Sequence, residues 1–88
     1  MSWQILYTKK AMADIPRLKA ARLDGKARAL IELLRENPYQ TPPPFEKLQG
    51  ALSGACSRRI NIKHRLVYEV LEEEKVVKII SMWTHYEF

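Results

Sequence analysis

Three residues spread along the chain supply the groups that metal-free cleavage of RNA needs: Glu46, Arg65 and His85. A carboxylate can take the proton from a ribose 2′-hydroxyl, a guanidinium can neutralise charge on phosphorus, and an imidazolium can protonate the leaving 5′-oxygen. Such a reaction leaves a 2′,3′-cyclic phosphate. Each residue taken alone could equally be an exposed polar side chain, so the combination carries the hypothesis of base, cation and acid.

A basic segment lies between the first and the last of these residues. Residues 47–68 contain five Lys or Arg, one His and no acid, whereas Glu72-Glu73-Glu74 follow closely. Arg58 and Arg59 should alternate across a strand, so we expect one, preferably Arg59, to face the ligand and the other to be solvated. A late aromatic residue could stack on a base. The expected substrate-binding residues are Lys47, Arg58, Arg59 and Tyr86.

Composition limits the class of protein. With 88 residues and 47% hydrophobic content, residues 1–88 should form a single globular domain. The net charge of +5 and the sequence pI near 9.6 favour an acidic partner. The chain lacks both an apolar run of the ~20 residues that a membrane span needs and a secretory signal pattern, which predicts a cytoplasmic protein with no membrane contact.

Cysteine and histidine content argues against two further kinds of site. Cys56 is a single cysteine, which excludes an internal disulfide, and two histidines with one cysteine are poor material for a zinc site. A buried or inert role suits Cys56 better than catalysis, because it has no basic partner that would activate the thiolate. We expect no metal and no cofactor.

The N-terminal part predicts a strand followed by a helix. Alternation at Trp3, Ile5 and Tyr7 indicates a short strand, after which Thr8 can cap a helix over residues 9–23 with Met12, Ile15 and Leu18 packed on one side. Pro16 falls inside this pattern. It predicts either a kink or a helix that starts near Asp14.

A second helix is the clearest element. Asp24 is a candidate N-cap, and the stripe of Ala27, Leu30, Ile31 and Leu34 has helical spacing. Asn37-Pro38 should end the helix. The run Thr41-Pro42-Pro43-Pro44 should form a stiff connector that delivers Glu46 to a defined place.

From Cys56 onward the apolar pattern changes to a period of two, through Ile60 and Ile62, then Leu66, Tyr68 and Val70, then residues 76–83. Turns near Lys63 and at Glu72 to Lys75 should separate three antiparallel strands. Trp83, within an apolar strand, is more often a core residue than a stacking platform. The fold class is therefore α+β: an N-terminal strand, two helices, then an antiparallel β-meander.

Several motifs together resemble one family. The run Leu52-Ser53-Gly54, then Ser57-Arg58-Arg59-Ile60, then His64-Arg65-Leu66-Val67-Tyr68, with His85-Tyr86 near the end, resembles the YoeB/Txe toxins of the RelE superfamily. The resemblance covers nearly the whole chain. It implies a microbial-RNase-like fold, with Glu46 as general base, Arg65 as transition-state stabiliser, His85 as general acid, and Arg59 and Tyr86 in the active-site region.

The resemblance also implies a function and partners. It points to an mRNA interferase that enters the ribosomal A site, next to rRNA, and cleaves mRNA there, paired with a YefM/Axe-like antitoxin in a toxin–antitoxin complex or present as a homodimer. Two alternatives stay open: a non-catalytic relative that inhibits gyrase by protein contact, as ParE does, and a degenerate RNA-binding module. The chain departs from the family pattern at Ala55-Cys56, Gln49 and the added Glu87-Phe88.

Overall fold

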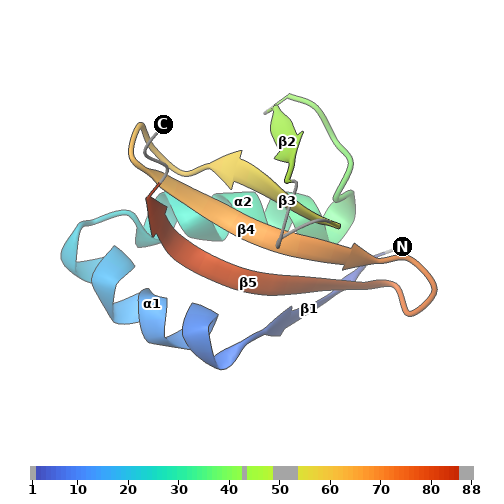
Figure 1. Cartoon of the computed structure of the whole chain (residues 1–88), viewed down its shortest axis with the longest axis horizontal. Coiled ribbons are helices and arrows are strands. Elements are labelled where there is room, and N and C mark those ends of the chain that lie inside the picture. Colours follow the sequence, from blue (N-terminus) through green and yellow to red (C-terminus); the bar gives the residue numbers. More distant parts are fainter. Residues whose placement is uncertain (1, 43, 49–53, 86–88) are drawn as a thin grey trace.

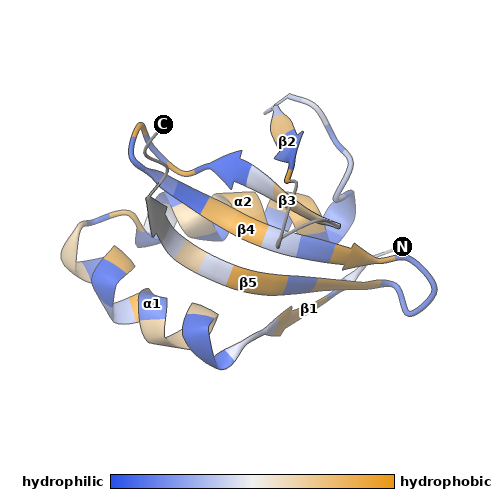
Figure 2. Cartoon of the chain, in the orientation of Figure 1, coloured by the Kyte–Doolittle hydropathy of each residue, from blue (hydrophilic) through white to orange (hydrophobic). Residues whose placement is uncertain are grey.

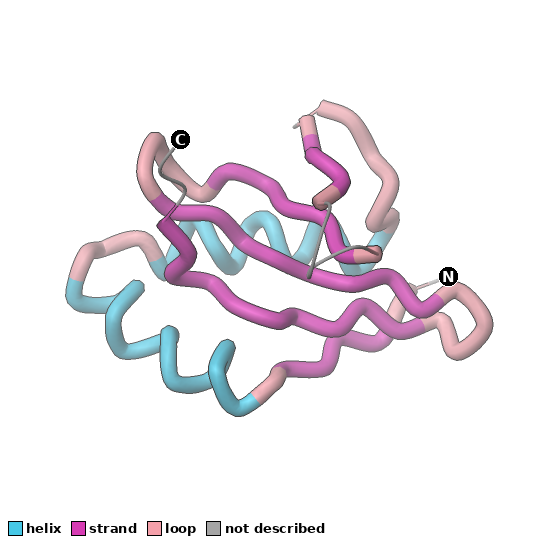
Figure 3. The backbone as a smooth tube through the Cα atoms, viewed as in Figure 1, coloured by secondary structure: helices cyan, strands magenta, loops and turns pink. Residues whose placement is uncertain are grey.

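The chain forms one five-stranded sheet and two helices, arranged as Figures 1 and 3 show. The computed structural model describes residues 2–42, 44–48 and 54–85, with the backbone alone for residues 84 and 85. Within these residues neither helix is long and apolar enough to cross a bilayer. In chain order the elements are β1 (Gln4–Tyr7), α1 (Lys9–Ala20), α2 (Asp24–Glu36), β2 (Phe45–Lys47), β3 (Ala55–Arg59), β4 (His64–Leu71) and β5 (Val76–His85).

The sheet order is β1-β5-β4-β3-β2. β3, β4 and β5 form the predicted antiparallel meander, which confirms the α+β class. Two features go beyond the prediction. β1 pairs in parallel with β5, and the segment expected as the end of a connector forms a short edge strand, β2, antiparallel to β3.

The core lies between the helices and one face of the sheet. Its members come from both helices and from alternate positions of the central strands, since successive side chains of a strand point to opposite faces. Figure 2 shows the apolar stretches concentrated on β4 and β5. The cluster of buried residues is Ala11, Leu18, Leu23, Ala27, Ile31, Leu34, Ile60, Leu66, Tyr68, Val77, Ile79 and Met82.

The first helix corrects two expectations. α1 begins at Lys9, not near Asp14, because the Thr8 hydroxyl caps it by accepting a hydrogen bond from the Ala11 N–H at 3.1 Å. It continues through Pro16, whose lost hydrogen bond is offset by this cap and by burial of one helix face. Met12, expected in the core, is 59% exposed, while Asp14 is buried.

The second helix confirms its apolar stripe but not its cap. Ala27, Ile31 and Leu34 are buried, and Asn37 is the C-cap residue. Asp24 is the first helical residue rather than the N-cap: Leu23 holds the cap position and makes no side-chain cap bond. The Asp24 carboxylate therefore acts through the positive end of the helix dipole.

The first strand of the meander is shorter than the period-two pattern indicates. β3 ends at Arg59, and Ile62 is 87% exposed in the turn. The Asn61 side-chain oxygen accepts hydrogen bonds from the Lys63 and His64 N–H groups, which closes this turn before the alternation could continue. The second turn, at residues 72–75, lies where the sequence predicts it.

Candidate active site

Strand alternation brings four polar residues together on the sheet face opposite the core. In register, Glu46 of β2 lies opposite Ser57 of β3, and Arg59 of β3 lies opposite Arg65 of β4. Positions 57 and 59 share one face of β3 because they are two residues apart. Short strands thus place a carboxylate and two guanidinium groups side by side from three separate segments.

Glu46 and Arg65 are in direct contact. The Glu46 Oε2 atom lies 3.2 Å from Arg65 Nη1, and the same nitrogen donates a hydrogen bond to Ser57 Oγ at 3.4 Å. The Arg65 side chain is 11% exposed, whereas that of Glu46 is 59% exposed. The guanidinium is therefore held in place by the sheet, while the carboxylate remains accessible to a ligand.

The contact lies in a pocket of about 330 Å³ lined by Pro44, Glu46, Ser57, Arg59 and Arg65. Two cations and one carboxylate leave the pocket with a net positive charge, which suits a phosphodiester better than a neutral ligand. This arrangement agrees with two expectations from the sequence. Glu46 and Arg65 lie together, and Arg59 rather than Arg58 faces the pocket.

The backbone of His85 reaches the same end of the sheet. Thr84 is the β5 partner of Arg65, and His85 is the partner of His64, so the His85 Cα lies across from the residue next to Arg65. The backbones of residues 65 and 85 therefore lie at the same end of the sheet, with Thr84 and not His85 directly opposite Arg65. The role of His85 stays a prediction.

Arg58 is not at the pocket, contrary to the expectation that it binds substrate or is solvated. It is fully buried on the core side of β3: its Nε donates to Tyr68 Oη at 3.0 Å and its Nη2 donates to the Pro38 carbonyl at 3.0 Å. Its guanidinium also lies 5.0 Å from the Phe45 ring centroid. Burial raises the pKa of the Tyr68 phenol, and the nearby Arg58 charge acts in the opposite direction. Arg58 therefore fixes the connector and β2 to the sheet.

The two neighbouring arginines make a matched test. Arg58→Met leaves the Tyr68 hydroxyl and the Pro38 carbonyl without their charged donor, and we expect the free energy of unfolding to fall by at least about 2 kcal/mol. Arg59→Met, on the open face, should change it by less than about 0.5 kcal/mol. Urea unfolding followed by circular dichroism measures both. Equal destabilisation by the two substitutions would contradict the buried role of Arg58.

Lys47 also lies away from the Glu46 pocket. It follows Glu46 in β2 and so faces the other way, into a second pocket of about 480 Å³ that includes Tyr39, Cys56 and Val70. This placement corrects the expectation that Lys47 contacts the same substrate as Glu46. Burial raises the pKa of the Cys56 thiol, with Lys47 and Arg58 acting in the opposite direction, so the thiol is not activated.

The remaining sequence expectations divide into two groups. Trp83 is partly buried against the core, as predicted, and stacks on His64 with ring centroids 3.8 Å apart. Tyr86, Gln49 and the Glu87-Phe88 extension lie outside the described residues, so the stacking role of Tyr86 stays a prediction.

Sequence reasoning missed Ser57. Its side chain is completely buried, accepts the hydrogen bond from Arg65 and lines the pocket. The available signal was its parity with Arg59, since two positions separated by two residues face the same side of a strand.

Solved structures with the same architecture define the class of protein. A YoeB/ParE toxin from Agrobacterium tumefaciens superposes with a TM-score of 0.83 at 28% identity, covering 94% of this chain and 99% of that one. A chain of the YoeB-YefM complex from Staphylococcus aureus gives a TM-score of 0.77 at 30% identity, covering 98% and 100%. The fold is that of the RelE-superfamily toxins.

The sequence assigns the family within that class. The model of the YoeB-like toxins of bacterial type II toxin-antitoxin systems matches residues 7–86, and the chain belongs to this family. Toxin YoeB of Synechocystis is 40% identical over 58 residues, which is 66% of this chain. That match spans 65% of the Synechocystis protein.

Proposed function

We propose that this toxin is a ribosome-dependent endoribonuclease that cleaves mRNA in the ribosomal A site and so inhibits translation. The observation that carries the proposal is the contact between Glu46 and Arg65 at 3.2 Å inside a pocket that also holds Arg59. An accessible carboxylate beside a fixed guanidinium provides a proton acceptor next to a site for phosphate. Metal-free RNA cleavage needs this combination.

The proposed reaction assigns one step to each of these groups. Glu46 takes the proton of the 2′-hydroxyl, whose oxygen attacks the adjacent phosphorus. Arg65 and Arg59 stabilise the negative charge that develops on the phosphorane oxygens. His85 donates a proton to the departing 5′-oxygen, and the strand ends in a 2′,3′-cyclic phosphate. The protein supplies base, cation and acid itself, so the step needs no metal ion or cofactor.

The ribosome provides what the small pocket lacks. A pocket of about 330 Å³ has room for little more than one nucleotide, so its hold on free RNA should be weak and sensitive to salt. With a net charge of +5, the protein can bind the rRNA that surrounds the A site. Binding there would hold the mRNA in a fixed geometry over Glu46 and Arg65.

Antitoxin binding provides control. The Staphylococcus aureus relative is solved as a YoeB-YefM complex, and we propose a YefM/Axe-like antitoxin for this chain as well. An acidic segment that folds onto the open face would neutralise Arg59 and Arg65 and cover Glu46. The toxin would act in the cytoplasm after the antitoxin has dissociated from it. A homodimer is a further assembly to test.

The decisive experiment uses toxin treated with EDTA and then dialysed, added to ribosomes stalled on a defined mRNA. We expect a single cut in the A-site codon, a 2′,3′-cyclic phosphate end, and no cut when the nucleotide 5′ to the scissile phosphate is 2′-deoxy. A 3′-hydroxyl end would reject the mechanism. Intact mRNA with ribosome binding would favour the RNA-binding module, and intact mRNA with gyrase inhibition would favour the ParE-like alternative.

A further inference from the structure

The last part of β5 extends beyond the strand that flanks it. β1 ends at Tyr7, paired with Ile79, and the Thr8 N–H donates to the Ile79 carbonyl at 3.1 Å. Residues 80–85, which lead to His85, continue past that point. Along this stretch α1 lies beside β5 in place of a strand, as Figure 1 shows.

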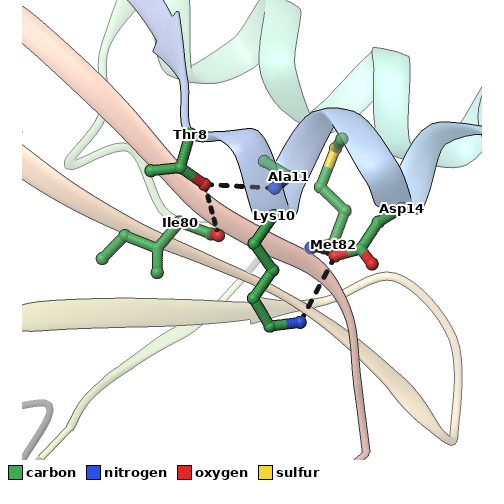
Figure 4. A network of polar contacts seen from close by, with 6 residues as sticks. All are labelled: Thr8, Lys10, Ala11, Asp14, Ile80 and Met82. Carbon is green, nitrogen blue, oxygen red and sulfur yellow. Dashed lines mark hydrogen bonds and ion pairs between the residues drawn. The ribbon is translucent and has the colours of Figure 1, made fainter.

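Two side chains of the α1 region take over the hydrogen bonds that a strand would make there. The Thr8 hydroxyl donates to the Ile80 carbonyl at 2.8 Å, and Asp14 Oδ2 accepts from the Met82 N–H at 3.0 Å. Figure 4 shows both contacts reaching from the helix to the strand. We call Thr8 and Asp14 the α1 clamp.

The clamp contacts β5 where its pairing with β4 is irregular. The pairing register of β4 with β5 shifts between Arg65 and Val67 and again between Val67 and Tyr68. At each shift β5 contains one more residue than β4, so the extra residues of β5 lie between Ile79 and Thr84. A bulge disrupts the ladder locally and bends the strand. Ile80 and Met82 fall within this irregular stretch, and the clamp supplies fixed hydrogen bonds there.

Asp14 is an unusual residue to find in this position. It is 2% exposed within α1, and a buried carboxylate is costly unless it is hydrogen-bonded or paired. Its partners are the Met82 N–H and, at 3.7 Å, the Lys10 ammonium, whose side chain is 64% exposed. Leu or Ala would suit the apolar face of α1 without this cost. The hydrogen bond from the Met82 N–H of β5 therefore accounts for a carboxylate at this buried position.

We propose that Asp14 is a positioning residue for the proposed cleavage: through Met82, with Thr8 acting through Ile80, it sets the path of β5 and thereby the place of His85 at the end of the strand, opposite His64. The inference rests on the proposed function. Asp14 does not touch the reacting atoms. Its effect is on the protonation of the leaving group, because His85 lies three residues beyond Met82 on the clamped strand.

The kinetic test uses an mRNA whose scissile 5′-oxygen is replaced by sulfur, a leaving group that needs little help from an acid. On the oxygen substrate Asp14→Ala should lower the rate at saturating toxin by about 10²-fold, the cost of misplacing a catalytic group by ~1 Å, with ribosome affinity unchanged. The sulfur substrate should remove most of this deficit, as for His85→Gln. The deficit of Glu46→Gln should persist.

Matched variants separate positioning from general damage. Asp14→Asn keeps an oxygen that can accept from Met82 and should restore most activity, and Lys10→Ala, which loses the exposed ion pair alone, should cleave like wild type. Should Asp14→Ala fail to fold, Thr8→Val replaces it, compared with Thr8→Ser, which keeps the hydroxyl. A deficit that remains on the sulfur substrate, or unchanged cleavage, would overturn the proposal.

Amide hydrogen exchange tests the clamp independently of catalysis. Loss of the Asp14 carboxylate should speed exchange from Met82 to His85 more than exchange in the middle of β4. Unchanged exchange at these amides would overturn the clamp even if the toxin cleaves RNA. If wild-type protein leaves mRNA intact, the proposed function fails, while faster exchange in Asp14→Ala still supports the control of β5 by α1.

Discussion

Glu46→Gln should lower the rate of mRNA cleavage on the ribosome by about 10²–10⁴-fold, the usual cost of losing a general base. Glutamine has the same size and keeps an oxygen that can accept from Arg65 Nη1, now 3.2 Å from the carboxylate. It cannot take a proton from the 2′-hydroxyl. Single-turnover cleavage of a ribosome-bound mRNA at saturating toxin measures the chemical step directly.

The design separates this loss of chemistry from loss of structure or binding. Because the Glu46 side chain is 59% exposed, its ion pair should contribute no more than about 1 kcal/mol to stability, so Glu46→Gln should remain folded. Glu73→Gln, in the exposed turn between β4 and β5, removes the same charge away from the pocket and should cleave like wild type. Wild-type cleavage by Glu46→Gln would exclude the carboxylate as the base.

His85→Gln should have a loss of similar size, about 10²–10⁴-fold, with ribosome binding largely retained. Glutamine can form hydrogen bonds but cannot deliver a proton to the 5′-oxygen. The same single-turnover assay measures the rate, and binding is followed by co-sedimentation with ribosomes. The other histidine is the control: His64 stacks on Trp83 in the interior, so His64→Gln should affect stability more than chemistry.

Growth arrest on induction provides a second readout for His85. A nuclease predicts that cells expressing His85→Gln grow while cells expressing the wild type arrest. Equal arrest, at equal protein levels, would point to inhibition through protein contact. That result would move this chain toward the ParE-like alternative, whatever the cleavage assay shows in vitro.

The elements that the sequence predicts well are those whose signal is local. The α2 stripe of Ala27, Ile31 and Leu34 and the cap of α1 by Thr8 depend on residues within a turn or two of each other. Two of the wrong or incomplete predictions involve distant partners. β2 is three residues long and exists because β3 pairs with it, and α1 survives Pro16 because its buried face packs on the sheet.

The candidate site divides along the same line. The chemistry of Glu46, Arg65 and His85 is readable from residue types, and alternation separates Arg58 from Arg59. Alternation does not say which of the two arginines is buried, because that depends on what packs against each face of β3. Phe45 and the Pro38 carbonyl lie on the Arg58 face, and the pocket lies on the Arg59 face. Only the residues that pack against each face of β3 decide that Arg58 is buried and Arg59 is exposed.

The sequence by itself determined the kinds of group available, the α+β class and the family, since these follow from residue types, periodicity and motifs along the chain. The tertiary structure decided which of those groups meet. Glu46 and Arg65 are 19 residues apart and touch only because β2, β3 and β4 pair in one register. Asp14 contacts Met82, 68 residues away in the sequence, because α1 packs against the sheet. No local sequence pattern records such packing.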